Sequence, residues 1–166
     1  MTSLADGPAR FPGGLPDGLQ YAYINSGFIY QDTGTLLTVG MTYTLTAYIG
    51  KRTDDPDAAG SLSLESFTGG LPTAVLATTG SVTSPSGTFT KYTTTFTASS
   101  VQAGQDLGIV FTTTGTSGPA NQVNFDAVSL MQTSAPVPEA STTVSFGLLL
   151  ALGLGGLFVA GRRRKA

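Results

Sequence analysis

An uncharged apolar segment near the C-terminus is the feature that most limits how this chain can fold. Residues 142–161 contain no charged side chain, and a helix of 20 residues spans about 30 Å, the hydrocarbon thickness of a bilayer. A basic cluster follows directly, made of Arg162, Arg163, Arg164 and Lys165. Because such clusters stay in the cytoplasm, the sequence predicts a transmembrane helix at 142–161, a cytoplasmic tail at 162–166 and an extracytoplasmic body. A buried helix of a soluble domain is the alternative, but no polar stripe interrupts the apolar surface.

The rest of the chain lacks the residues that many enzymes use. It contains no His and no Cys, which excludes a Ser-His-Asp triad, a thiol nucleophile, an imidazole metal site and a disulfide framework. Residues 1–161 hold four bases against ten acids, a net charge of −6 that does not favour nucleic acid. The composition therefore favours a protein that is not an enzyme and that needs no cofactor.

The body has the alternating pattern of β-strands. Thr, a β-branched residue that suits strands, accounts for 26 of the 166 residues. Residues 41–49 alternate between apolar side chains and mostly Thr, which is the period of a half-buried strand. Residues 21–24 and 28–31 flank Asn-Ser-Gly at 25–27 and predict a hairpin. We expect an all-β fold of antiparallel strands arranged as a sandwich.

The last predicted strand, at 123–130, changes its pattern halfway. Apolar residues occupy odd positions up to Phe125 and even positions from Val128 onward. A β-bulge near Asp126 is needed to keep both groups on the core side of the strand.

The end of the chain resembles the PEP-CTERM sorting tail of bacterial exported proteins. A proline-containing linker at 133–141 carries Val137, Pro138 and Glu139, which match the first part of that motif, whereas Ala140 stands where a second proline is usual. The resemblance implies a partner, the membrane-embedded processing enzyme exosortase, that cuts near the motif. An ordinary single-span anchor with a proline linker is the alternative.

The body resembles the galactose-binding-like jelly rolls of carbohydrate-binding modules. The resemblance rests on the stretches 31–50, 89–98 and 124–130 and covers residues 18–131. It implies a jelly-roll domain at 18–132 after an irregular segment at 1–17. The usual first strand, with Asn-Gly-x-Phe-Glu, is missing, so we expect an open edge or cavity beside the last strand. Residues 1–20 also lack a signal peptide, and we expect the sequence to begin downstream of the true start.

The same resemblance suggests sites for a metal and for sugar. It places Asp126 where a structural calcium ligand would lie, and a hard carboxylate oxygen suits that ion. A bulge in which Asp126 is simply hydrogen-bonded is the alternative. Sugar binding needs aromatic platforms, and the candidates are Tyr48, Tyr30 and Tyr92. For each of these residues, an ordinary core or surface role is the alternative.

Three functions remain open from the sequence. The first is a non-catalytic bacterial envelope protein, held in the cytoplasmic membrane with an extracytoplasmic body and then released to the cell surface or secreted after exosortase processing. The second is a carbohydrate-binding module for extracellular polysaccharide. The third is a carboxylate-dependent hydrolase, for which Glu65 and Asp126 are the candidate acids, although neither has a local signature.

Overall fold

The computed structural model describes residues 7–55, 57–114 and 122–134. All of them lie in the first of two compact units, Met1–Ala135 and Pro136–Ala166. The predicted transmembrane helix, basic tail and sorting motif lie outside the described residues, and so does the linker except for residues 133 and 134. None of the helices within the described ranges is long and apolar enough to cross a membrane.

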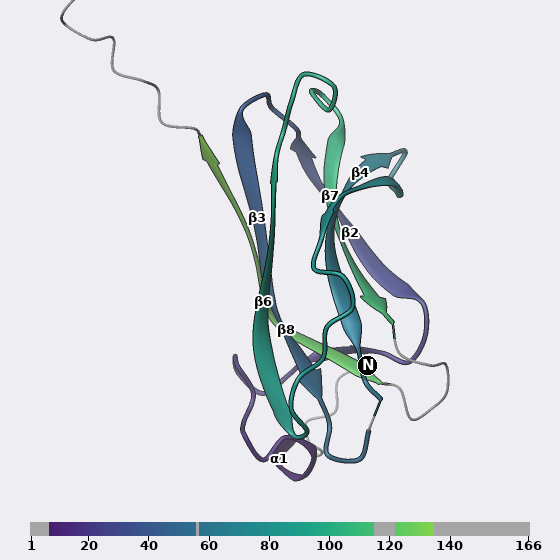
Figure 1. Cartoon of the computed structure of the whole chain (residues 1–166), viewed down its shortest axis with the longest axis vertical. Helices are drawn as coiled ribbons and strands as arrows, with labels where there is room; N and C mark the ends of the chain where they lie inside the picture. Colours follow the sequence, from purple (N-terminus) through teal and green to yellow (C-terminus); the bar gives the residue numbers. More distant parts are fainter. Residues whose placement is uncertain (1–6, 56, 115–121, 135–166) are drawn as a thin grey trace, which may run out of the picture. The chain divides into compact units, whose positions relative to one another are not determined.

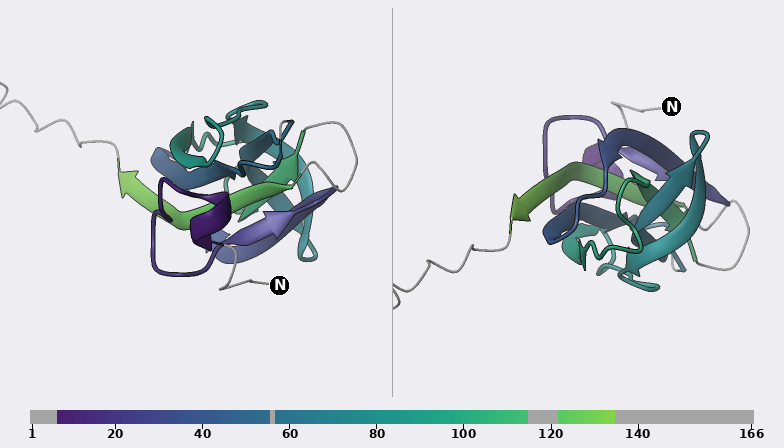
Figure 2. Two further views of the ribbon diagram at one scale, coloured as in Figure 1. Left: turned by 90° about the horizontal axis from the view of Figure 1, so that it is seen from below. Right: turned by 90° about the horizontal axis from the view of Figure 1, so that it is seen from above.

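Eight strands form two antiparallel sheets, as the sequence predicted. The first sheet has the order β1-β8-β3-β6, and the second has the order β2-β7-β4-β5. The strands of the first sheet are β1 (Ala22–Ile24), β8 (Val123–Ser134), β3 (Met41–Lys51) and β6 (Thr88–Thr97). Those of the second are β2 (Phe28–Leu36), β7 (Asp106–Thr113), β4 (Gly60–Thr68) and β5 (Leu71–Thr78). The sheets stack as two layers, which face each other in Figure 1 and are seen from both ends in Figure 2.

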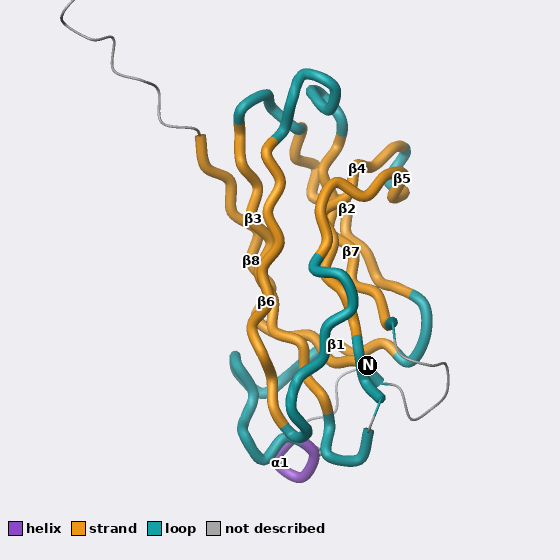
Figure 3. Tube along the Cα trace, viewed as in Figure 1, coloured by secondary structure: helices purple, strands orange, loops and turns teal. Residues whose placement is uncertain are grey.

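A four-residue helix, α1 (Gly7–Arg10), precedes the strands. Figure 3 shows that strands and loops make up almost all of the described chain. The all-β prediction is therefore confirmed for this part of the protein.

The core lies between the two sheets and follows the alternation seen in the sequence. On β3, Tyr43, Leu45, Ala47 and Ile49 are all buried, which confirms the predicted inward face of this strand. The rings of Phe111 on β7 and Phe125 on β8 meet across the layers with their centroids 5.0 Å apart. Side chains at intervening positions of each strand consequently point away from the opposite sheet.

The predicted bulge in the last strand is confirmed. The pairing of β3 with β8 shifts between Thr46 and Tyr48, where one residue of β3 lies opposite two residues of β8, Val128 and the residue that follows Asp126. That residue, Ala127, has a φ of 47°, a left-handed conformation that is uncommon for any residue except glycine. Leu130 packs against the core as expected, but Val128 is 47% exposed.

The predicted hairpin at 21–31 is wrong. Gly27 has the expected positive φ of 78°, so the turn forms where the sequence places it. However, β1 pairs with β8 in the first sheet and β2 pairs with β7 in the second. The turn therefore carries the chain from one layer to the other, because each strand finds a partner that is distant in sequence.

Candidate functional site

Three aromatic side chains form a row on the outer face of the second sheet. Phe28 and Tyr30 lie on β2 with ring centroids 5.9 Å apart, and Tyr30 is 5.8 Å from Phe67 on β4. Phe28 and Tyr30 are 54% and 43% exposed, whereas Phe67 is 2% exposed. The first two rings thus offer open surface to a ligand, and the buried Phe67 ring packs against Tyr30.

Gly108 allows Phe67 to lie across the strand between these residues. A Cβ atom at position 108 would be 2.1 Å from Cε2 of Phe67, so only glycine leaves room for the ring. In the register of the sheet, Gly108 pairs with Asp32 on β2 and with Glu65 on β4. Residues directly opposite each other in neighbouring strands point to the same side. Two carboxyl groups therefore flank the position that the Phe67 ring covers.

The two carboxyl groups have different surroundings. Burial raises the pKa of Glu65, and no hydrogen bond or charge in the described part of the chain offsets this effect. Asp32 accepts a hydrogen bond from the N–H of Gly34 at 2.9 Å, which stabilises the turn after it. We call Phe28, Tyr30, Asp32, Glu65 and Phe67 the acid–aromatic face. It combines a group that holds its proton to higher pH with exposed rings.

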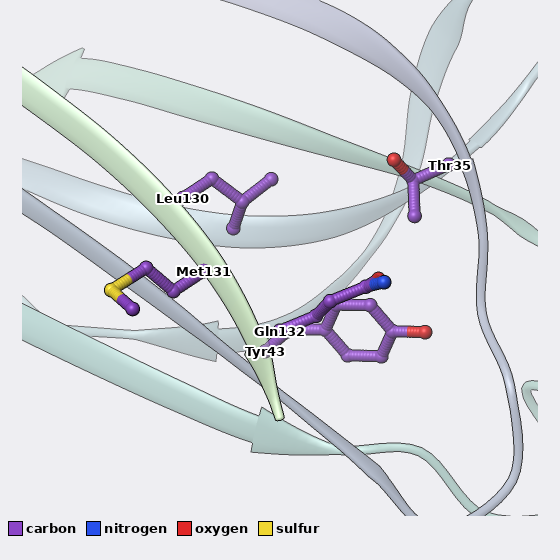
Figure 4. Close-up of a pocket in the computed structure, with 5 residues that line it drawn as sticks. All are labelled: Thr35, Tyr43, Leu130, Met131 and Gln132. Carbon is purple, nitrogen blue, oxygen red and sulfur yellow. The ribbon is translucent and has the colours of Figure 1, made fainter. Parts of the chain in front are cut away.

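A cavity of about 260 Å³ opens between the sheets beside β8. It is lined by Thr35, Tyr43, Leu130, Met131 and Gln132, which Figure 4 shows. The described part of β1 pairs only with the start of β8, so the later part of β8 is an edge and the sandwich is open there. Within the described residues, the cavity therefore lies beside the last strand, where the sequence led us to expect an opening. Tyr43 is the member of this lining that can exchange a proton, and its hydroxyl accepts the N–H of Thr38 and donates to the carbonyl of Leu36.

A wider hollow of about 510 Å³ surrounds Asp126 on the first sheet. Asp17, Gly18, Leu19 and Gln20 form its other walls. One carboxylate oxygen of Asp126 accepts the N–H of Ala127 at 2.7 Å, and the other accepts the N–H of Asp17 at 3.2 Å. The carboxylate thus stabilises the bulge and anchors the loop before β1.

The carboxylate of Asp126, the predicted calcium ligand, already has backbone partners. Both oxygens of Asp126 already accept backbone N–H groups, whereas calcium takes six to eight oxygen ligands. Nowhere in residues 7–55, 57–114 and 122–134 do three His, Cys, Asp or Glu side chains gather as a metal-binding group. These observations do not test a site completed by backbone carbonyls, so a calcium role for Asp126 stays a prediction.

The three tyrosines suggested for sugar contact do not share a surface. Tyr30 lies on the acid–aromatic face of the second sheet. Tyr48 pairs with Lys91 on the outer side of the first sheet, whereas Tyr92 packs against the core and donates its hydroxyl to the carbonyl of Thr83 at 2.5 Å. Of the three tyrosines, the structure thus places only Tyr30 on the acid–aromatic face, together with Glu65, one of the two acids considered for a hydrolase.

The sequence reasoning missed Phe28, Phe67 and Gly108. Phe28 and Tyr30 are two residues apart, as are Glu65 and Phe67, so alternation alone puts each pair on one side of its strand. Nothing in the sequence shows that Gly108 joins these two pairs, because the strand register does this.

Comparisons with known proteins identify a group of related enzymes. Residues 2–131 match a family model described as HpiC1-like, HpiC1 cyclase. A solved cyclase from Fischerella sp. TAU is 26% identical with a TM-score of 0.65, and the match covers 79% of this chain and 73% of that one. A cyclase from Fischerella sp. TAU in complex with 4-(1H-indol-3-yl)butan-2-one is 26% identical with a TM-score of 0.59, covering 74% and 68%. No curated protein sequence gives a significant match.

A xylanase structure shares the fold at greater distance. The CBM22-1–GH10 modules of xylanase 10B from Clostridium thermocellum, complexed with xylohexaose, are 18% identical with a TM-score of 0.51. The match covers 76% of this chain and 24% of that one. At this identity the likeness concerns the β-sandwich only and carries no ligand to this chain.

These matches overturn the functions expected from the sequence. A non-catalytic envelope protein was the leading expectation, with a carbohydrate-binding module and a hydrolase as alternatives. The family model and the Fischerella structures point instead to a cyclase, so the expectations of a non-enzyme and of these three functions are wrong. The absence of His and Cys misled the prediction, because proton transfer needs only one carboxyl group in a suitable environment.

Proposed function

Because the chain belongs to the HpiC1-like cyclase family, we propose that it is an enzyme that closes a ring in a planar aromatic substrate on its acid–aromatic face. The observation that carries the proposal is Glu65, a half-buried carboxyl group with a raised pKa beside a row of aromatic rings. Acid-initiated cyclisation needs a proton donor and a surface that holds the substrate and its cation. Glu65 has both, because its pKa is raised and aromatic rings lie on the same face.

Glu65 acts as the general acid. Because burial raises its pKa, the Glu65 carboxyl group holds its proton to higher pH than an exposed Glu. It can donate this proton to an unsaturated carbon of the substrate, where a π bond breaks as the new C–H bond forms. A second π bond of the same molecule then attacks the resulting cation, which closes the ring. A proton finally returns from the product cation to the Glu65 carboxylate. The product is an isomer of the substrate, so the reaction needs no oxidant, reductant or second substrate.

The aromatic row serves both the substrate and the cation. Phe28 and Tyr30 expose ring faces on which a planar substrate can stack, which contributes about 0.5–1.5 kcal/mol beyond the area buried. The same faces attract a cation by about 0.5–2 kcal/mol, depending on how dry the site becomes. Because the positive charge exists only after proton transfer, this attraction stabilises the transition state more than the neutral substrate.

An indole derivative is the substrate class that best suits the face. The ligand bound in the related Fischerella structure, 4-(1H-indol-3-yl)butan-2-one, is such a molecule. We carry this class to the present chain because two exposed rings on one strand match the size of a fused bicyclic system.

Turnover of a panel of indoles with unsaturated side chains tests the proposal. The product is recognised as a species of unchanged mass and altered chromatographic retention. We expect Glu65→Gln, which keeps the shape but has no acidic proton, to lower turnover at least a hundredfold, in line with loss of a general acid. Asp126→Asn is the matched comparison, because it alters the only carboxylate on the described strands of the first sheet. Full activity of Glu65→Gln together with loss in Asp126→Asn would move the reaction to the hollow on that sheet.

Finer expectations from the sequence are separate proposals. A jelly-roll strand order, a membrane anchor at 142–161 and processing near Pro138 are supported by the sequence patterns given above. Intact-mass measurement of the protein from its native host, after membrane fractionation, tests the anchor and the processing. Neither result alters the proposed chemistry of Glu65.

A further inference from the structure

Charge is distributed unequally between the two sheets. The four strands of the second sheet contain no Lys or Arg, whereas Lys51 and Lys91 lie on the first sheet. The second sheet carries three acids: Asp32, Glu65 and Asp106.

All three acids point to the same side of the second sheet. Asp32 and Glu65 pair with Gly108, and Asp106 pairs with Phe67, which belongs to the aromatic row. The inner side of β7 is occupied instead by Leu107 and Ile109 of the core. Acidic and aromatic groups are therefore concentrated on one face, without a base on any of its strands.

Resting on the proposed function, we propose that the acid–aromatic face binds small aromatic ammonium ions in preference to neutral or anionic molecules of the same shape. The ring of such an ion stacks on Phe28 and Tyr30, which are the exposed members of the row. Its positive charge lies toward Asp32, which pairs with Gly108 beside the Phe67 ring.

Two physical effects favour this class of ligand. Aromatic ring faces carry partial negative charge and attract cations directly. The half-buried Asp32 carboxylate adds a Coulomb attraction that a fully exposed charge would largely lose to screening. A stable ammonium ion also resembles the cation formed during ring closure, and molecules that resemble a transition state bind more tightly than the substrate. Together these effects predict a preference of roughly tenfold or more over the neutral molecule.

Three indoles that differ mainly in side-chain charge provide the test. Tryptamine is an ammonium ion at neutral pH, 3-ethylindole is neutral and indole-3-propionate is an anion. Binding is followed through the ligand's own fluorescence, excited at the red edge of indole absorption, because the chain contains no Trp. We expect tryptamine to bind most tightly and indole-3-propionate most weakly, and we expect added salt to reduce the difference.

Variants of the full chain locate the effect. Asp32→Asn should reduce the preference for tryptamine over 3-ethylindole severalfold, whereas Tyr30→Ala should weaken the binding of both. Asp57→Asn, in an exposed loop, is the control because it changes the net charge equally and lies outside the second sheet. Its preference should equal that of the unmodified protein.

The outcomes separate this inference from the proposed function. Equal affinity for tryptamine and 3-ethylindole overturns the inference, even where Glu65→Gln abolishes turnover. Equal loss of preference in Asp57→Asn and Asp32→Asn also overturns it, because net charge alone would then explain the effect. A tryptamine preference lost in Asp32→Asn supports the inference, even where Glu65→Gln remains active and the proposed reaction is rejected.

Discussion

Replacement of Gly108 by alanine is expected to damage the stability of the second sheet and the acid–aromatic face together. The new Cβ would lie 2.1 Å from Cε2 of Phe67 and 2.4 Å from both Cδ2 and Cζ, so the ring must leave its place. Full exposure of a phenylalanine side chain costs about 1.5–3 kcal/mol, and loss of its contact with Tyr30 adds about 0.5–1.5 kcal/mol. Alanine is better than glycine in a strand by about 0.5–1 kcal/mol, which offsets part of this cost.

The net effect is a loss of about 1–4 kcal/mol in the free energy of unfolding. Urea denaturation of the full chain measures it as a lower midpoint with an unchanged slope. Fluorescence titration should also show weaker binding of an indole, because Tyr30 loses the Phe67 ring against which it packs.

Gly50→Ala is the matched control on the other sheet. There a Cβ would lie 2.4 Å from Cε1 of Phe89, a half-buried ring that packs against Phe11. This variant should lose stability but bind the indole normally. A Gly108→Ala protein that unfolds and binds like the unmodified chain would refute the reasoning, and so would equal loss of binding in both variants.

Three further predictions concern single groups, each checked by urea denaturation. Burial raises the pKa of Asp55 in the folded protein, despite hydrogen bonds from backbone N–H groups. The folded state therefore binds this proton more tightly than the unfolded state does, and the free energy of unfolding falls as pH rises through the folded pKa. Between about pH 4 and neutrality, the free energy of unfolding should therefore fall less in Asp55→Asn than in the unmodified chain. The same dependence on pH in both proteins would contradict this. Tyr43→Phe should cost about 1–2 kcal/mol, because its hydroxyl accepts the N–H of Thr38 at 3.0 Å and the buried ring keeps its packing. Ala127→Gly should be more stable than Ala127→Val by about 1–2 kcal/mol, because the φ of 47° disfavours a β-branched side chain; equal stability would exclude strain at the bulge.

Local sequence patterns predicted the strands well. The alternation at 41–49 identified the buried face of β3, and the change of parity after Phe125 identified the bulge near Asp126. Both features depend only on neighbours along one strand, since each side of a strand meets one environment. The hairpin at 21–31 was wrong because strand pairing depends on distant segments, and here both strands pair with segments 70 or more residues away.

The candidate site could not be predicted from the sequence, because it too depends on pairing between distant strands. Glu65 was an isolated acid in the sequence, and its raised pKa results from burial that only the folded chain creates. Asp32, Gly108 and Glu65 become neighbours through the register of three strands. The composition was also misleading, because it excluded His and Cys chemistry but not catalysis by a single carboxyl group.

The most direct test of the central claim is NMR chemical-shift mapping of tryptamine on the ¹⁵N-labelled full chain. The account predicts that the largest amide shifts occur on the acid–aromatic face, around residues 28–32 of β2, 65–67 of β4 and 108 of β7. Shifts concentrated around Asp126 and residues 17–20, or around Tyr43 and Leu130 in the cavity between the sheets, would contradict it.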